Sequence, residues 1–410
     1  MVRVAASLLS GLAALAGLQV LPQALAQDSA DTFAAPPPPP PPSSGGRDCS
    51  GVKAIHPACG QIEPPFRRDF FYVGGSLIPG VFGNITVGQL HVEKLTPVNG
   101  ARQPRPLVFF HGGGGFTGAT WLNTPDNRRG FAAWFLQQGY QVYLVDQPGL
   151  GRSSSNDLPN NPLTAGSGPE LVEAGFTAIE DLAAYPQAKL HTQWPGTGRK
   201  GDPAFEQFSR AIIPSSSNRT ATEEVMRTAG CELLSLIGPS YLIQHSYGGH
   251  WGILLSNDCG HNVAGSVNLE SSTIPFFWYG QGLGGTKQRA WGMTETKVDY
   301  VPAVSSPSEL QVVSVGEESL ARRNCYLQQE PGARKLPKVA KIPYLLLTTE
   351  ASVHITFAHC LDAFMRQIGA KPDWIKLADI GIKGNGHFMY LEKNSDKIAG
   401  VVHKWIQGRR

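Results

Sequence analysis

The stretch Tyr241–Gly252, with the sequence YLIQHSYGGHWG, decides how the rest of the chain can be interpreted. It begins with apolar residues typical of a buried strand and continues, after a glycine pair, with a helical pattern. Ser246 lies between the two, where a sharp turn from strand to helix exposes a serine hydroxyl. The usual motif is G-x-S-x-G; here Gly248 holds the last position, but Gln244 stands where the first glycine belongs. The stretch therefore predicts a nucleophilic serine in an irregular turn.

The N-terminal residues indicate an exported protein, and the net charge bears on its partners. Arg3 precedes an apolar stretch, and Ala24-Leu25-Ala26 offers small residues for cleavage, which predicts a secretory signal peptide over residues 1–26. A membrane anchor is the alternative, but the apolar run is short and interrupted by serine and glycine. The net charge is +3 without a basic stripe, so nucleic acid is not an expected partner. We expect a secreted, extracellular protein that is not held in a membrane.

The segment after the predicted signal peptide has a low-complexity composition. It contains the proline run Pro36–Pro42, followed by serine and glycine, which favours extended and flexible chain. We therefore expect residues 27–48 to be disordered and residues 49–410 to form one folded domain.

The cysteines and the N-x-Thr tripeptides fit an oxidising compartment. Six cysteines predict up to three disulfides, and Cys49 and Cys59 are close enough to close a local loop. The pairing of the other four stays open, although a Cys231–Cys259 bond would join the helices on either side of the Ser246 strand. The sites Asn84-Ile-Thr86 and Asn218-Arg-Thr220 predict glycosylation. No cysteine or histidine group has zinc-ligand spacing, so neither a metal nor another cofactor is expected.

Strands and helices alternate along the predicted domain. Strands are predicted over residues 70–73, 88–95, 107–110, 140–145, 241–243, 265–269, 342–349 and 374–377. Helices are predicted over residues 121–138 and 223–237, and after Ser395, which we expect to cap the last helix. This alternation predicts an α/β fold with a mostly parallel central sheet and helices on both faces.

Two segments interrupt the alternation. Residues 154–222 and 279–338 are rich in proline, glycine and serine, and both follow strand ends on the side where such sheets hold ligands. We interpret them as cap or lid insertions; disordered surface loops are the alternative.

A serine nucleophile needs a histidine base and an acid that orients it. His387 lies in the block Gly384-Asn385-Gly386-His387, between the last predicted strand and the last helix. The other candidate histidines compete less well. His245 and His250 lie on a strand and a helix, where we expect them to pack or to line the pocket, and His354 and His359 lie in a helical region. His387 is therefore the predicted base.

The glycine run Gly112–Gly115 follows a predicted strand directly after His111. Without side chains, its backbone can approach a substrate and donate N–H groups to a developing oxyanion. We predict an oxyanion hole formed by Gly113, Gly114 and the N–H of Tyr247.

Two carboxylates compete for the role of the acid. Glu270 ends the strand next to the Ser246 strand, and Glu350 ends the strand after that. Both lie at the edge of the sheet where the site is expected, and the residue pattern alone does not choose between them.

Several blocks together resemble the secreted esterase 713-like group of α/β-hydrolases. The blocks are Gln244-His245-Ser246, Asn268-Leu269-Glu270, Gln193-Trp194-Pro195-Gly196 with Gly201-Asp202-Pro203, Glu350-Ala351-Ser352, and Gly384-Asn385-Gly386-His387-Phe388-Met389 with Leu391-Glu392-Lys393-Asn394. The matches run from about Phe70 to the C-terminus, and the Gly-Asn-Gly-His block is the most specific.

This resemblance implies the α/β-hydrolase fold and a choice of acid. The group also lacks the first glycine of the turn and places its acid after the strand next to it. By resemblance, Ser246 is the nucleophile, His387 the base and Glu270 the acid, while Glu350 becomes a supporting residue. Tyr247 departs from the polar residue that the group often has, so contacts in the pocket differ. The resemblance is also compatible with a homodimer.

We therefore expect a secreted serine hydrolase that cleaves small-molecule carboxylic esters through an acyl-enzyme intermediate. The same triad would serve a lactonase, a thioesterase or a peptidase. A non-catalytic binding protein of the same fold is the alternative from a different class.

Overall fold

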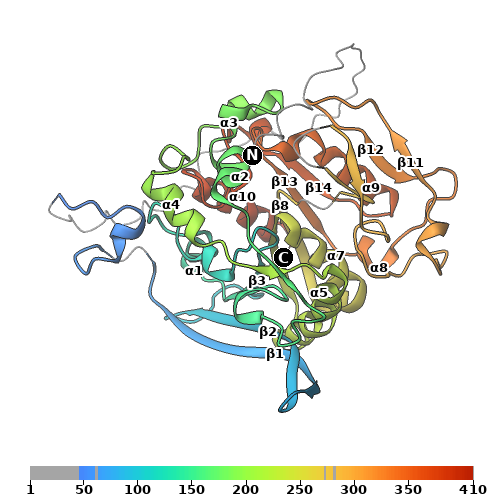
Figure 1. Cartoon of the computed structure of the whole chain (residues 1–410), viewed down its shortest axis with the longest axis horizontal. Helices are drawn as coiled ribbons and strands as arrows, with labels where there is room; N and C mark the ends of the chain where they lie inside the picture. The colour runs from blue at the N-terminus through green and yellow to red at the C-terminus, as the bar shows by residue number, and fades with distance from the viewer. Residues whose placement is uncertain (1–45, 61–62, 272–273, 280–282, 410) are drawn as a thin grey trace. The chain divides into compact units, whose positions relative to one another are not determined.

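A computed structural model of the chain describes residues 46–60, 63–271, 274–279 and 283–409 (Figure 1). The predicted signal peptide, residues 1–26, and most of the predicted disordered segment, residues 27–48, lie outside the described residues. Within the described ranges, none of the helices combines the length and the hydropathy that crossing a bilayer requires.

The central element is an eight-stranded sheet in the order β1-β2-β4-β3-β7-β8-β13-β14. Its strands are β1 (Phe66–Gly80), β2 (Gly83–Pro97), β3 (Leu107–Phe110), β4 (Val142–Val145), β7 (Ser240–His245), β8 (Val263–Leu269), β13 (Tyr344–Thr348) and β14 (Asp373–Lys376). The β1–β2 hairpin and the β2–β4 pair are antiparallel, and every pair from β4 to β14 is parallel. The prediction of a mostly parallel sheet is confirmed.

Ten α-helices are described, and six short strands lie outside the central sheet. The helices are α1 (Phe131–Gln137), α2 (Pro169–Val172), α3 (Ile179–Leu182), α4 (Pro203–Arg210), α5 (Arg219–Val225), α6 (Cys231–Ile237), α7 (Gly249–Cys259), α8 (Pro337–Ala340), α9 (Ala358–Gln367) and α10 (Ser395–Gln407). The short strands are β5 (Leu163–Thr164), β6 (Ser215–Ser216), β9 (Phe277–Tyr279), β10 (Gly285–Lys287), β11 (Val312–Val315) and β12 (Cys325–Gln328).

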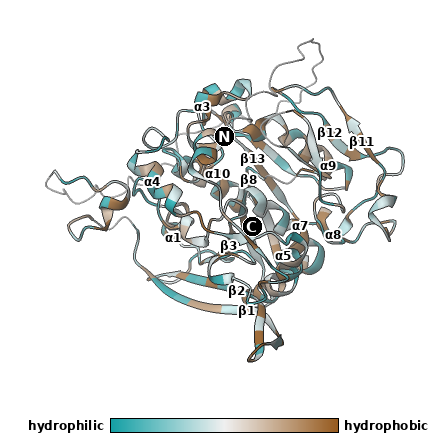
Figure 2. Cartoon of the chain, in the orientation of Figure 1, coloured by the Kyte–Doolittle hydropathy of each residue, from teal (hydrophilic) through white to brown (hydrophobic). Residues whose placement is uncertain are grey.

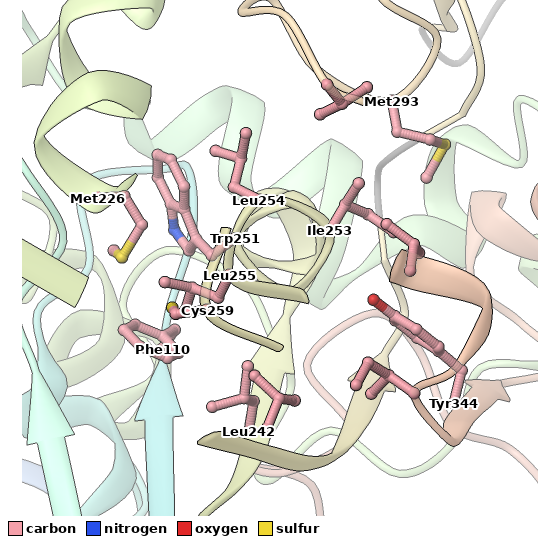
Figure 3. Close-up of a cluster of buried hydrophobic side chains, with 14 of the residues drawn as sticks. Phe110, Met226, Leu242, Trp251, Ile253, Leu254, Leu255, Cys259, Met293 and Tyr344 are labelled. Carbon is pink, nitrogen blue, oxygen red and sulfur yellow. The ribbon is translucent and has the colours of Figure 1, made fainter. Parts of the chain in front are cut away.

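Side chains alternate across each strand, so the sheet separates two hydrophobic cores. Val108 and Phe110 of β3 belong to the first core, together with residues of α6, α7, α8 and α9. In Figure 3, Trp251 and Leu254 of α7 lie in this core, with Phe110 below them and Leu242 of β7 close by. The helix that follows Ser246 is therefore anchored by burial on this face of the sheet.

The second core covers the opposite face. Leu107 and Phe109 of β3 pack there with Phe135 of α1 and with Ile398 and Val402 of α10. The outer hairpin differs: β1 is exposed over most of its length, whereas β2 is buried from residue 90 to residue 93, and both strands carry polar as well as apolar colours (Figure 2).

Two predicted helix starts are wrong. The helix predicted from residue 121 begins at Phe131, because Trp121 ends a short 3-10 turn and Asn127, at φ 64°, cannot continue a right-handed helix. The C-terminal helix starts at Ser395, but its N-cap is Asn394 and not Ser395. The Asn394 side chain instead exchanges hydrogen bonds with Asn385, near the predicted base.

Three disulfides are present: Cys49–Cys59, Cys231–Cys259 and Cys325–Cys360. The first closes the local loop expected from the sequence. The second joins the start of α6 to the end of α7, the helices before and after β7, as considered from the sequence.

The two interrupting segments form small elements outside the central sheet. Residues 154–222 contain α2, α3, α4 and the β5–β6 pair, and the described residues of 279–338 include β10, β11 and β12. The β11–β12 pair lies beside α9 in the orange part of Figure 1.

Candidate active site

Ser246 lies at the turn between β7 and α7. Its φ of 55° is left-handed, a conformation that costs a serine about 1–3 kcal/mol and that proteins keep mainly at functional sites. The turn is also crowded: a Cβ at Gly249 would lie 2.1 Å from the Ser271 hydroxyl, so only glycine fits there. The sharp strand-to-helix turn expected from the sequence is thus present, and Ser246 is partly exposed.

Gln244 occupies the place of the missing glycine and is fully buried. With its amide oriented to satisfy the surrounding groups, its oxygen accepts from Gly252 N at 3.2 Å. Its nitrogen then donates to the Gly249 carbonyl at 3.2 Å and to Asn268 Oδ1 at 3.3 Å. The longer side chain therefore fastens the start of α7 to the neighbouring strand β8.

The glycine run after β3 rests directly on this turn. A Cβ at Gly112 would lie 1.8 Å from the backbone nitrogen of Gly248, and one at Gly113 would lie 3.2 Å from Cβ of Tyr247. Gly113 and Gly114 have φ values of 75° and 66°, which favour glycine. The structure thus places Gly113 beside Tyr247, two of the three residues predicted for the oxyanion hole.

His387 and Glu270 are in contact. His387 Nδ1 lies 3.4 Å from Glu270 Oε2, and both residues are buried, at 4% and 2% exposure. Glu270 follows β8 and has a left-handed φ of 52°. Thr349 donates to the other carboxylate oxygen from its backbone N–H at 2.6 Å and from its hydroxyl at 2.9 Å.

Glu350 has a different partner. Its carboxylate accepts a hydrogen bond from the backbone N–H of Gly384, in the loop that carries His387. It therefore supports the position of this loop, while the carboxylate that contacts the His387 ring is that of Glu270.

A second histidine, His354, also contacts Glu270. Its Nδ1 lies 3.1 Å from Glu270 Oε2, and its ring is stacked on that of His387 with centroids 4.4 Å apart and planes 5° apart. From the sequence, His354 was set aside as a histidine in a helical region. Its position in a helical region gave no signal for this contact, because it arises from two strands that become neighbours only in the folded sheet.

The environment keeps Glu270 ionised and His387 neutral. Burial disfavours the Glu270 carboxylate, but interactions with His354 and His387 outweigh burial and lower its pKa to about 2. Burial, together with the electrostatic effect of the neighbouring His354, lowers the pKa of His387 to about 4, although Glu270 opposes this shift. At neutral pH, His387 is therefore ready to accept a proton.

Two further buried histidines connect β3, β7 and the His387 loop. His245 Nε2 lies 2.9 Å from the carbonyl oxygen of His387, and His245 Nδ1 lies 3.2 Å from His111 Nε2. Burial lowers the pKa of His111 to about 3 and that of His245 well below its usual range, so both rings are neutral. The residue before Ser246 thus holds the backbone of His387.

The His387 loop has another buried anchor, Glu392. It accepts hydrogen bonds from the Gly386 N–H at 2.9 Å and from the Asn385 side chain at 2.7 Å. His191, from the first insertion, also lies 2.8 Å from Glu392. Burial disfavours charge on His191, but Glu392 and Glu180 outweigh burial and raise its pKa. Glu392 belongs to a sequence block quoted above, but no role was predicted for it.

The first insertion reaches the candidate site. The Phe176 ring lies 5.4 Å from that of His387, between centroids, and equally close to Phe388. Among the contacts of the described residues, no hydrogen bond joins Ser246 to His387; in resting enzymes such bonds often tighten only when substrate binds.

Within the described part of the chain, two groups of side chains have the residue types of a metal site. In the first, Cys325 and Cys360 form a disulfide and are not thiolate ligands for a metal beside His359. In the second, ligand atoms of Glu270, His354 and His387 lie within 4.8 Å of one another. The two imidazole planes are parallel, so their nitrogen lone pairs do not converge on one point as tetrahedral coordination requires. The arrangement fits a carboxylate shared by two N–H donors.

The chain is similar in sequence and in fold to known hydrolases. The sequence pattern of the alpha/beta hydrolase family matches residues 107–401. The chain is 38% identical over 339 residues to a probable secreted lipase, phiG, of a fungal species, covering 82% of this chain and 89% of that relative. A novel bacterial esterase, solved at atomic resolution, aligns with a TM-score of 0.55 at 18% identity, covering 84% of this chain and 97% of that chain. At this identity the structural likeness concerns the fold alone.

Proposed function

The chain belongs to the alpha/beta hydrolase family, which confirms the fold expected from the sequence, and we propose that it is a secreted serine esterase. One observation carries the proposal: Glu270 contacts the ring of His387 while His245, the residue before Ser246, holds the His387 backbone. A nucleophile, a base and an acid are thereby held on adjoining parts of one sheet edge.

The proposed reaction has two halves. Ser246 Oγ attacks the ester carbonyl while His387 Nε2 takes its proton, and Glu270 stabilises the imidazolium that forms. The tetrahedral intermediate collapses to an acyl-enzyme, and His387 gives the proton to the leaving alcohol. Water then attacks the acyl group, again losing a proton to His387, and the acid product leaves as Ser246 regains its proton.

The oxyanion would be held by backbone donors. The N–H groups of Gly113, Gly114 and Tyr247 are the proposed ones, supported by the packing of the glycine run on the serine turn. Losing one such donor typically lowers kcat about 100-fold to 1,000-fold.

The substrate class rests on the relatives and on the sequence resemblance. The fungal relative is described as a secreted lipase, and the sequence resembles the esterase 713-like group, so the proposed substrate is a small-molecule carboxylic ester. The three disulfides support secretion, which would use the predicted signal peptide. We also propose that residues 154–222 cover the site, because Phe176 and His191 reach the His387 loop. A homodimer and a role of residues 279–338 as a second cap remain proposals from the sequence.

The test is hydrolysis of short-chain nitrophenyl esters by the purified protein and by Ser246→Ala. We expect the wild type to turn over and the variant to lose nearly all activity, with labelling of Ser246 by a fluorophosphonate probe in the wild type only. Wild-type turnover by Ser246→Ala would remove Ser246 from the mechanism. A native protein that neither reacts with the probe nor hydrolyses any ester would instead point to a binding protein of this fold.

A further inference from the structure

Glu270 Oε2 is shared by two histidines, one more than a triad requires. His354 Nδ1 approaches it to 3.1 Å and His387 Nδ1 to 3.4 Å, so the second histidine is the nearer one. Both imidazoles are buried, with side-chain exposures of 7% and 5%. The shared oxygen is therefore shielded from water, and the two rings are its immediate environment.

The hydrogen-bond pattern fixes where the protons are. An ionised carboxylate only accepts and has about four acceptor positions. Thr349 fills two of them at Oε1 through its N–H and its hydroxyl. The Nδ1 atoms of His354 and His387 both face Oε2, at 3.1 Å and 3.4 Å, and a hydrogen on each Nδ1 gives this oxygen its two nearest donors. Both carboxylate oxygens then face donors, which favours one orientation of the carboxylate. His387 is left with its Nε2 free to act as the base.

His354 is itself held in place. The single hydrogen of Nδ1 has a second acceptor within reach besides Glu270 Oε2, the Ser352 hydroxyl oxygen at 3.0 Å, and this oxygen accepts the His354 backbone N–H at 3.2 Å. Its ring packs against Phe357, with centroids 4.9 Å apart, as well as on His387. Its Nε2 is buried and, among the described residues, has no hydrogen-bond partner. The only polar contacts of the ring are therefore those made by Nδ1.

We propose that His354 is a positioning residue of the esterase reaction: it donates to Glu270 Oε2 and stacks on His387, and so sets the orientation of the acid and the plane of the base. This inference rests on the proposed Ser246–His387–Glu270 triad. Without the His354 donor, one acceptor position of Oε2 opens and the carboxylate can rotate about the bonds from Thr349. His387 then loses alignment in the step where it takes the serine proton.

The two contributions of His354 can be separated by two substitutions. In His354→Asn, the side-chain amide nitrogen is attached to Cγ as Nδ1 is, so the donor is kept and the ring is lost. In His354→Phe, the planar ring is kept and the donor is lost. His261→Asn is the matched control, because this exposed histidine lies before the start of β8, whereas Glu270 follows the end of that strand.

We expect His354→Phe to lower kcat about 10-fold to 100-fold, the range seen when a residue that orients a catalytic histidine or ligand is removed, with KM within about twofold of wild type. His354→Asn should recover most of this loss, and His261→Asn should match the wild type. Melting temperatures of all variants establish that the comparison is made on folded protein.

Two outcomes would overturn the inference. One is a wild-type kcat in His354→Phe. The other is an equal loss in the Asn and Phe variants with a matching fall in melting temperature, which would leave His354 a purely structural role. Ser246→Ala separates these results from failure of the triad: if that variant keeps its activity, the proposed function fails, whereas an inactive Ser246→Ala beside a fully active His354→Phe contradicts the positioning role alone.

Discussion

The Nε2 nitrogen of His245 lies 2.9 Å from the backbone carbonyl oxygen of His387. Since a carbonyl only accepts, His245 must donate from Nε2, and its neutral ring then accepts at Nδ1 from His111. His245 ends β7, His387 lies in the loop before α10, and His111 follows β3. This chain of hydrogen bonds therefore connects the serine turn, the base and the glycine run.

This connection can be tested by replacing His245 with a residue that cannot make both hydrogen bonds. His245→Leu leaves the His387 carbonyl and the His111 N–H buried without partners, which should destabilise the protein by about 1–3 kcal/mol for each group. His245→Gln keeps a donor near the position of Nε2 and should retain more stability and more activity. Thermal unfolding and ester turnover measure both effects. Equal behaviour of the two variants would show that the ring is needed only for its shape.

The assignment of the acid predicts unequal effects of two similar substitutions. Glu270→Gln removes the charge that stabilises the His387 imidazolium and places an amide between two N–H donors, so kcat should fall roughly 10,000-fold, as for the acid of other triads. Glu350→Gln alters one bond to the Gly384 backbone and should cost far less. Steady-state kinetics of the two variants give the comparison. The reverse order would move the acid to Glu350.

The acid limb of the pH profile reports the pKa of the free base. His387 is active when neutral, and its pKa is lowered to about 4, so kcat/KM should be half-maximal near pH 4 and flat through neutral pH. Glu270, with a pKa of about 2, stays ionised over this range. Turnover of a nitrophenyl ester can be followed from about pH 3 upward, with circular dichroism to verify folding. A limb near the usual histidine value of 6.5 would contradict the burial effect.

The glycine run predicts a position where one methyl group is not tolerated. Gly112→Ala would place Cβ 1.8 Å from Gly248 N and 2.5 Å from the Tyr247 carbonyl carbon, both backbone atoms of the serine turn. We expect loss of activity with strong destabilisation, measured by turnover and thermal unfolding. Gly400→Ala is the matched control: it lies in α10 with open space around it, and should be neutral or stabilising by up to about 1 kcal/mol. An active, stable Gly112→Ala would show that the loop can move away from the turn.

The sequence predicted the elements whose burial is visible in the pattern. The run Leu107–Phe110 has apolar residues at every position because it is buried on both faces, and it is found as β3. The same signal misled the prediction at Trp121: its side chain belongs to the core that α1 covers, so it fits the helical periodicity although it precedes the helix. The spacing of apolar residues predicts which side chains are buried. It does not predict where a helix begins, because residues just before the helix can be buried in the same core.

The candidate site was predictable residue by residue, but not as a network. Ser246, His387 and the two candidate acids follow strand ends, which is a local property. The contact of His354 with Glu270 depends on the pairing of β8 with β13, which are separated along the chain by the whole second insertion. No local pattern carries such a contact, and the same is true of the pairing of His191 with Glu392.

The amide of Gln244 and the hydroxyl of Ser266 together occupy the space beside Gly252 that a methyl group would need, since a Cβ there would lie 2.6 Å from an atom of each. Glutamine at the first position of the turn and serine on the next strand thus close the same space, and residue 252 is left room only for glycine. A search pattern that requires glycine at the first position would overlook a turn built in this way.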